Sequence, residues 1–323
     1  MSTEPLLQLR HVSIEFQVDD GEGWLSAVDD VSLDVSTGEI LGLVGESGCG
    51  KTTLAMAIVG LLASNARQRG EIRFRGRDLT SLPEAERRKL RGGQIGMVFQ
   101  DPLSSLDPAF SVGSQVADTI AVHNRVSARA ARARAIELLR EVGIPSPDER
   151  YGDPPHQFSG GMRQRVVIAA ALANDPALVL ADEPTTALDV TIQAQILLLL
   201  QELAEQHHTT IVLIAHDLGV VAQLCERVGV MYAGQLVEVA PVADLFAAPL
   251  HPYTQALFAA LPTADHAPGS LSVVEGQVPD LVDPPRGCRF APRCPHRMAV
   301  CSERPALLEQ NVGHTVACWL YAA

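Results

Sequence analysis

The sequence lacks any apolar run long enough to cross a membrane. A transmembrane helix needs about 20 apolar residues, and the longest runs here, Leu54–Ala63 and Val166–Ala173, are roughly half that length. The first ten residues carry Glu4 and no apolar stretch, so no secretory signal is expected. These absences predict a cytosolic protein that reaches a membrane only through a partner.

Positive charge is also scarce. The 323 residues contain 25 Lys and Arg against 38 Asp and Glu, which gives a formal net charge of −13. Nucleic acids and anionic membrane surfaces favour basic faces, so neither is an expected partner. The basic run in 128–142 is expected to be the solvated face of a helix. The length allows one large domain and a smaller one, and a sizeable buried core.

Paired C-x₂-C cysteines, the usual signature of structural zinc, are absent. Cys49 and Cys225 are unpaired in a chain without a secretory signal, which indicates a reducing compartment. The other four cysteines lie near the C-terminus with the spacing C-x₅-C-x₆-C-x₁₆-C, which suggests a metal or cluster, with unpaired structural cysteines as the alternative. These four are Cys288, Cys294, Cys301 and Cys318.

Residues 45–52 read Gly-Glu-Ser-Gly-Cys-Gly-Lys-Thr, which fits the phosphate-loop pattern G-x-x-x-x-G-K-[ST]. An apolar run, Ile40–Val44, precedes the loop, and Thr53–Leu62 has helix-forming composition, so the required strand–loop–helix context is present. Glycines allow successive N–H groups to point at a phosphate, whereas a glycine-rich turn without a ligand is the alternative. Lys51 is expected to neutralise the β- and γ-phosphates, and the Thr52 hydroxyl to hold Mg²⁺. The predicted ATP or GTP contacts are Gly45, Glu46, Ser47, Gly48, Cys49, Gly50, Lys51, Thr52 and Thr53.

Four apolar runs each end at a polar residue, which is typical of strands buried on both faces of a parallel sheet. Ligands of such sheets lie beyond the carboxyl ends of the strands. Alternating apolar residues before residue 40 predict antiparallel strands beside this sheet, and 102–173 has a helical pattern. The four runs are Ile40–Val44, Ile95–Phe99 before Gln100, Ala177–Ala181 before Asp182-Glu183, and Ile211–Ala215 before His216.

Asp182 and Glu183 close the third of these runs. In a phosphate-loop protein the first carboxylate is expected to reach Mg²⁺, directly or through water. The second, one residue further on, could polarise the attacking water as a general base. An isolated Asp-Glu pair is more often just exposed charge, but its position after a buried strand favours the functional interpretation.

The segment Phe158-Ser159-Gly160-Gly161-Met162 resembles the Leu-Ser-Gly-Gly-Gln signature of the ATP-binding-cassette (ABC) ATPases. The resemblance covers about residues 7 to 250 and rests on six motifs in the family's order. Phe158 and Met162 depart from the usual Leu and Gln, so a side-chain amide contact from position 162 is lost. The six motifs are the phosphate loop, Gln100, the signature, the Asp182-Glu183 strand, Ala187-Leu188-Asp189 and His216.

The resemblance implies a dimer in which two chains enclose two nucleotides. Ser159, Gly160, Gly161 and Met162, at the start of the helix 161–173, would contact the γ-phosphate held by the other subunit. A single phosphate loop and a single signature then require a second ATPase subunit, either an identical chain or a paralogue. An aromatic residue near the end of the first strands should stack on adenine; Phe16 is the candidate, with Trp24 second and core packing of Phe16 as the alternative.

The resemblance also assigns roles at the strand ends. His216 would sense the γ-phosphate and orient water together with Glu183, and Asp189 belongs to the family's motif after the Asp-Glu strand. Gln100 would touch Mg²⁺ or water and link ATP status to Asp101–Phe110, where such ATPases meet membrane-spanning permease subunits.

The C-terminal part, with Gly287-Cys288-Arg289-Phe290-Ala291-Pro292-Arg293-Cys294-Pro295 after His251-Pro252-Tyr253-Thr254, resembles the extension of dipeptide and oligopeptide importer ATPases. That resemblance implies a [4Fe–4S] cluster on the four cysteines, with Zn²⁺ as the alternative. Residues after Val282 offer little apolar material, so the cluster is expected to staple this part. Residues 262–285 are expected to be a linker.

The overall prediction is an α/β phosphate-loop NTPase of ABC type, with a mostly parallel core sheet, an antiparallel β-subdomain and a helical signature subdomain at about 102–173. The predicted domains are 1–250 and a cysteine-rich extension, 251–323. The expected function is ATP hydrolysis, on the cytoplasmic face of a membrane, for an importer of peptides delivered by an extracytoplasmic binding protein. Nickel or another solute, and a soluble non-transport ABC ATPase, are the alternatives; a GTP switch is disfavoured because no Asn-Lys-x-Asp motif occurs.

Overall fold

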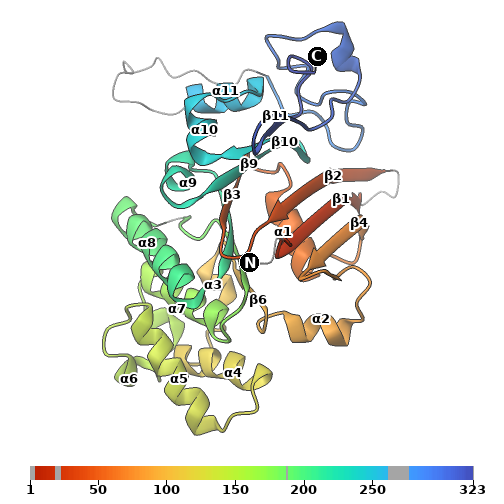
Figure 1. The fold of residues 1–323 in the computed structure, drawn as a ribbon. Coiled ribbons are helices and arrows are strands. Elements are labelled where there is room, and N and C mark those ends of the chain that lie inside the picture. Colours follow the sequence, from red (N-terminus) through yellow and green to blue (C-terminus); the bar gives the residue numbers. More distant parts are fainter. Residues whose placement is uncertain (1–3, 19–22, 187, 261–275, 323) are drawn as a thin grey trace. The chain divides into compact units, whose positions relative to one another are not determined.

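The computed structural model describes residues 4–18, 23–186, 188–260 and 276–322 (Figure 1). The described residues form two compact units. Unit 1 contains residues 1–35, 41–80 and 216–323, and unit 2 contains 36–40 and 81–215. The expectations for Ala187 and for residues 262–275 of the linker lie outside the described residues. In the described part of the chain, no helix is both long and apolar enough to span a bilayer.

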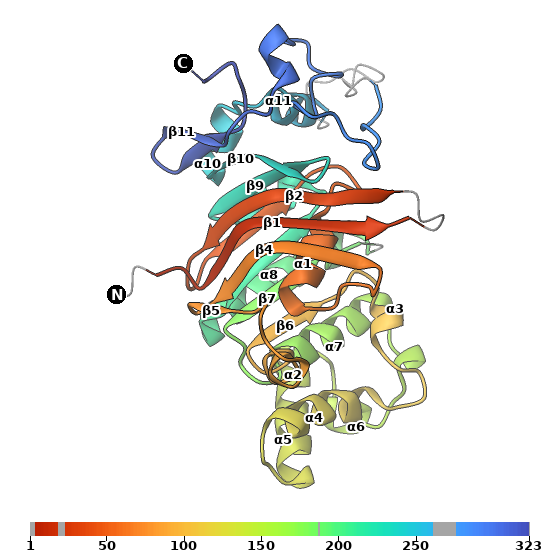
Figure 2. The same cartoon turned by 90° about the vertical axis from the view of Figure 1, so that its right-hand side faces the viewer.

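Unit 1 contains the antiparallel sheet that the alternating N-terminal pattern predicts. Leu9, Val12 and Ile14 of the first strand are buried, and the residues between them are not. The strands lie side by side in the order β2-β1-β4-β5 (Figure 2). They are β1 (Leu7–Gln17), β2 (Trp24–Val35), β4 (Ala66–Phe74) and β5 (Arg77–Asp78).

A second set of strands in unit 1 positions the phosphate loop. β3 (Ile40–Val44) is entirely buried, as the sequence predicts, and pairs in parallel with β9 (Arg227–Tyr232). β9 continues through the turn Ala233-Gly234, in which both residues have positive φ, into the antiparallel strand β10. The C-terminal hairpin joins this set, because β12 pairs with β10. The remaining bounds are β10 (Gln235–Pro241), β11 (Leu308–Asn311) and β12 (His314–Val316).

The helix after the phosphate loop differs from the prediction. It runs over Lys51–Val59 as α1, two residues earlier at its start and three residues shorter at its end than the expected Thr53–Leu62. Gly60 ends it by taking a left-handed conformation, with its N–H bonded to the Ala57 carbonyl and the Leu61 N–H bonded to the Met56 carbonyl. The other helices of unit 1 are α9 (Leu218–Leu224), α10 (Val242–Ala247), α11 (Pro252–Ala259) and the 3₁₀ turn η2 (Ala299–Ser302).

Unit 2 contains three parallel strands in the order β8-β7-β6. β7 ends at Asp182 itself, β8 ends directly before His216, and β6 ends two residues before Gln100. β7 begins one residue later than the expected Ala177 and includes Asp182. β6 ends at Val98, one residue before the expected Phe99. The strands are β6 (Ile95–Val98), β7 (Leu178–Asp182) and β8 (Thr210–Ala215), accompanied by α2 (Glu84–Leu90), α3 (Pro102–Ser105) and α8 (Val190–His207).

The helical part of unit 2 confirms the pattern seen in the sequence (Figure 1). The basic helix buries Ala131, Ala135, Leu138 and Leu139 on one face, while most of its arginines are exposed. Its Arg134 pairs with Glu141 at 2.7 Å, so the expected solvated face is confirmed. The helices are α4 (Val112–His123), α5 (Ala128–Glu141), α6 (Pro147–Arg150), the 3₁₀ turn η1 (Pro155–Gln157) and α7 (Gly160–Leu172).

Candidate active site

The phosphate loop connects β3 to α1, and its glycines have the backbone conformations expected from the motif. Gly45, Gly48 and Gly50 have φ values of 149°, 78° and 102°. A Cβ atom at Gly45 would overlap the Met231 carbonyl oxygen, and one at Gly50 the carbonyl oxygen of Ala27. At Gly48 there is open space. Two glycines are therefore required by neighbouring backbone, whereas the third is required by φ alone.

Lys51 is the first residue of α1, and its side chain spans the loop. The residue is only 5% exposed, and its Nζ donates to the carbonyl oxygens of Gly45 at 2.7 Å and Glu46 at 3.0 Å. The same ammonium lies 3.5 Å from the Cys49 sulfur. Burial raises the pKa of the Cys49 thiol and outweighs the opposing effect of Lys51, so this cysteine is a packed neutral group.

In unit 2, Gln100 and Glu183 are brought together although they are far apart in the sequence. Gln100 Nε2 donates to Glu183 Oε2 at 2.9 Å, and Thr186 Oγ1 donates to the same oxygen at 2.8 Å. Glu183 itself has φ of 45°, an uncommon value for a residue with a side chain. Asp182, at the end of β7, is 3% exposed. Sequence reasoning missed Thr186, for which the only available signal is its place in the turn after Glu183.

The signature segment forms the start of α7. Ser159 is the N-cap residue, and its Oγ accepts from the Met162 N–H at 3.3 Å. A Cβ atom at Gly161 would approach Ile192 Cγ2 to 2.6 Å, while Gly160 has more room. Asp189 caps α8 by accepting from the Ile192 N–H at 3.0 Å. The signature and the Asp189 motif therefore meet around Ile192.

Three further candidates belong to unit 1. Phe16 is half-buried near the end of β1 and pairs with Leu25 of β2. The Trp24 ring has the Arg67 guanidinium 3.8 Å from its centroid. His216 follows β8 directly and lies at the start of the last segment of unit 1.

The four C-terminal cysteines line one cavity. Among the residues that the structure describes, no three His, Cys, Asp or Glu side chains form a metal-ligand group as they stand. Burial raises the pKa of the Cys288 and Cys294 thiols, and that of Cys318 to about 11, while backbone N–H groups of Phe290, His296 and Leu320 act in the opposite direction.

The extension also has a packing surface that the sequence did not predict. Tyr253 and Phe290 pack on Tyr232 of β9, with ring centroids 4.6 Å and 5.2 Å from the Tyr232 ring. All three residues are at most 2% exposed. Residues after Val282 therefore share an apolar core with strand β9 of unit 1, and the expectation that a cluster staples this part stays a prediction.

Comparison with known proteins extends these observations to the whole chain. The family described as ABC transporter matches residues 28–186, and the oligopeptide/dipeptide transporter C-terminal region matches residues 237–301. The dipeptide transport ATP-binding protein DppD of Bacillus subtilis is 46% identical over 98% of this chain and 95% of that protein. The oligopeptide transport ATP-binding protein OppD of Escherichia coli is 45% identical over 98% and 93%.

The chain belongs to the ABC transporter family. The fold agrees, because the dimeric ATP-binding cassette MJ0796, solved with ADP and phosphate bound, superimposes with a TM-score of 0.66. That match has 31% identity and covers 73% of this chain and 98% of the other. The predicted fold class is thereby confirmed, and the protein is an ATPase of the ABC type.

Proposed function

We propose that this ABC ATPase drives the import of dipeptides or oligopeptides as a peripheral subunit on the cytoplasmic side of a permease. The observation that carries the cargo class is full-length similarity to peptide-transport ATP-binding proteins, which includes the C-terminal region. The ATPase itself does not contact cargo. The permease and an extracytoplasmic binding protein are therefore the partners expected to select the peptide.

The residues of the phosphate loop are proposed to bind the nucleotide. The amides after Glu46 and the Lys51 ammonium would neutralise phosphate charge. Mg²⁺, when bound, supplies charge neutralisation between the phosphates, and oxygen donors of Thr52, Asp182 and Gln100 suit this cation. Phe16 is the proposed adenine contact.

Glu183 is proposed as the general base for the attacking water. Two donors, Gln100 and Thr186, fix the orientation of its carboxylate, and a fixed base is what proton abstraction requires. His216 would orient the same water. Because Gln100 donates to Glu183 and precedes Asp101–Phe110, a permease contact at that segment would act on the base through a single side chain.

The Ser159-Gly160-Gly161 helix start is proposed to serve the nucleotide of a second ATPase subunit. α7 has thirteen residues, and its first N–H groups and dipole favour a phosphate. The partner is either an identical chain or a paralogue.

The four C-terminal cysteines are proposed to hold a [4Fe–4S] cluster, with Zn²⁺ as the competing ligand. Their convergence on one cavity and the backbone N–H groups near three of the sulfurs fit thiolate ligation. Among the described residues, these thiols do not form a metal-ligand group as they stand. Anaerobically purified protein should contain iron and sulfide, and Cys294→Ser should lose both; stoichiometric zinc would favour the rival.

The proposed role of Glu183 as general base is tested with the variant Glu183→Gln. This variant should bind ATP normally and lose turnover by about 1000-fold, because only the proton acceptor is removed. Glu202→Gln, at an exposed position of α8, is the matched control and should hydrolyse normally. Near-normal turnover of Glu183→Gln would remove this residue from its role.

The proposal that the cargo is a peptide is tested by purifying the membrane assembly and identifying its binding protein.

A further inference from the structure

Glu46, the second residue of the phosphate loop, is bonded through three of its groups. Its carboxylate accepts from Arg293, with Nη1 3.1 Å from Oε2 and Nη2 3.3 Å from Oε1. Its backbone N–H donates to Tyr253 Oη at 2.9 Å. Its carbonyl oxygen accepts from Lys51 Nζ at 3.0 Å and from the Cys49 N–H at 3.2 Å. The residue thus connects the C-terminal extension to the lysine expected to bind phosphate.

The Arg293 side chain is itself firmly placed. It is 5% exposed, and its Nη1 also donates to Tyr232 Oη at 3.3 Å. Tyr232 in turn packs against Tyr253 and Phe290. A planar guanidinium held between a carboxylate and a phenol makes directional contacts that lysine cannot reproduce. Loss of Arg293 would remove this ion pair from the Glu46 carboxylate, whose side chain is only 26% exposed.

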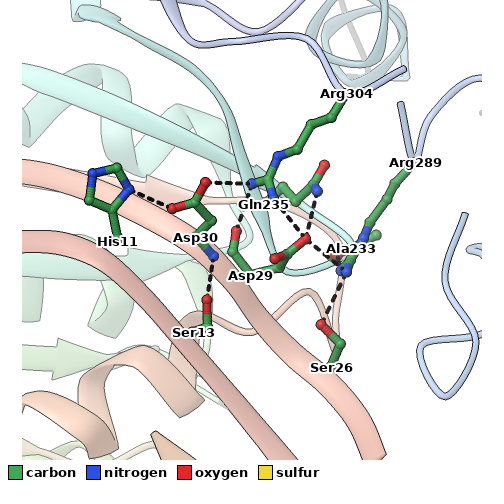
Figure 3. Close-up of polar contacts among 9 residues, drawn as sticks. All are labelled: His11, Ser13, Ser26, Asp29, Asp30, Ala233, Gln235, Arg289 and Arg304. Carbon is green, nitrogen blue, oxygen red and sulfur yellow. Dashed lines mark hydrogen bonds and ion pairs between the residues drawn. The ribbon is translucent and has the colours of Figure 1, made fainter. Parts of the chain in front are cut away.

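The extension has a second ionic anchor, formed by Arg289 and Arg304 with carboxylates of β2 (Figure 3). Arg289 and Arg304 both reach Asp29 of β2, at 2.9 Å and 3.2 Å, and Arg304 also lies 3.6 Å from Asp30. Asp30 is held from the other side by His11 at 2.7 Å. This anchor docks the same part of the chain without contacting Glu46, and it therefore provides an internal control.

We propose that Arg293 is a positioning residue of the nucleotide site, which fixes Glu46 and, through its carbonyl group, the Lys51 ammonium. The C-terminal extension then helps to position the residues of the phosphate loop. Arg293 directly precedes Cys294, which lines the cysteine cavity, so a change in the conformation of the cysteine segment is expected to reach the phosphate loop. Coupling between two sites acts in both directions.

The test is the affinity of the isolated full-length chain for ATP, measured by titration calorimetry. Arg293→Met should weaken ATP binding by about tenfold, within the usual range of coupling between sites. Glu46→Gln should give a similar loss, and the double variant should be little worse than either single variant. Arg304→Met, which disturbs only the second anchor, should bind ATP normally. Arg293→Lys should recover part of the affinity.

A second measurement separates positioning from simple loss of folding. Tyr253→Phe keeps the ring packing and removes only the acceptor for the Glu46 N–H, so it should raise the KM for ATP by about threefold with kcat nearly unchanged. In the wild-type chain, ATP should slow hydrogen exchange in residues 288–301, and Arg293→Met should abolish this protection. Unchanged ATP affinity in Arg293→Met, or an equal loss in Arg304→Met, would overturn the proposal. Neither outcome depends on which cargo is transported.

Discussion

The phosphate loop and the cysteine-bearing loops of the extension are both irregular segments, but they are ordered in different ways. The backbone conformation of the phosphate loop is encoded by a short motif of three positive-φ glycines and the adjoining helix, although Met231, Tyr253 and Arg293 also contact the loop. The extension depends on distant contacts: Arg293 and Glu46 are 247 residues apart, and Arg289 and Ser26 are 263 apart. A short sequence motif can therefore predict the conformation of the phosphate loop, whereas the conformation of the cysteine-bearing loops depends on contacts with several distant elements.

The largest expected effect on stability comes from substituting a glycine of the phosphate loop, and it should differ between Gly45 and Gly48. Gly45→Ala should lower the free energy of unfolding by about 4 kcal/mol, because the new Cβ overlaps the Met231 carbonyl oxygen as well as straining φ. Gly48→Ala should cost only about 1 kcal/mol, because the space there is open. Urea unfolding without nucleotide measures both. Equal costs would show that neighbouring backbone does not shape this loop.

The next effect concerns the aromatic contact that orders the extension. Phe290→Ala should destabilise the protein by about 3 kcal/mol, since the ring is 2% exposed between Tyr232 and Tyr253. Hydrogen exchange should rise first in residues 276–322. Phe110→Ala, at a ring that is 55% exposed, should change stability by less than about 0.5 kcal/mol. If exchange in the extension stays unchanged, its order has another source.

A smaller effect is the pH dependence contributed by His251, which caps α11. Burial lowers the pKa of His251 to about 3, from an ordinary value of 6.5. Between these values the unfolded chain binds a proton that the native chain does not. Stability from this group is therefore complete above pH 6.5 and is lost as pH falls towards 3, by up to about 1.4 kcal/mol per pH unit.

The measurement compares wild type with His251→Asn in urea at pH 7.5 and pH 5.5. Asparagine can still accept the Tyr253 N–H, which His251 Nδ1 accepts at 3.0 Å. The variant should lose less stability between the two pH values than wild type by about 1 kcal/mol. Parallel curves for the two proteins would contradict the assignment to His251.

Much of the fold followed from local sequence pattern. The buried runs before the phosphate loop and before Asp182-Glu183 gave strands close to the expected bounds, because β-branched apolar residues favour that state. The β9–β10 hairpin was missed, since its turn is Ala233-Gly234 rather than Asn-Gly or Asp-Gly. The expected helix runs past Gly60, whereas α1 ends there because this glycine takes a left-handed conformation, which helix-forming composition alone does not indicate.

Part of the candidate site could likewise be predicted from local sequence, and part could not. The loop motif predicts its own residues, but no motif predicts that Gln100 and Thr186 donate to one oxygen of Glu183, or that Tyr253 and Arg293 reach Glu46. These contacts depend on how segments pack, which the spacing of residues does not encode. The roles of Phe16, His216 and Asp189 stay predictions.

The central claim, hydrolysis by a pair of subunits, is tested most directly by turnover per chain of Ser159→Arg over a range of protein concentrations. Ser127→Arg is the matched control, because Ser127 also caps a helix by accepting a backbone N–H, at α5. Wild type and control should turn over faster per chain as concentration rises, while Ser159→Arg binds ATP normally and loses at least about 100-fold in rate. Concentration-independent hydrolysis by a monomer, unchanged in Ser159→Arg, would contradict the account.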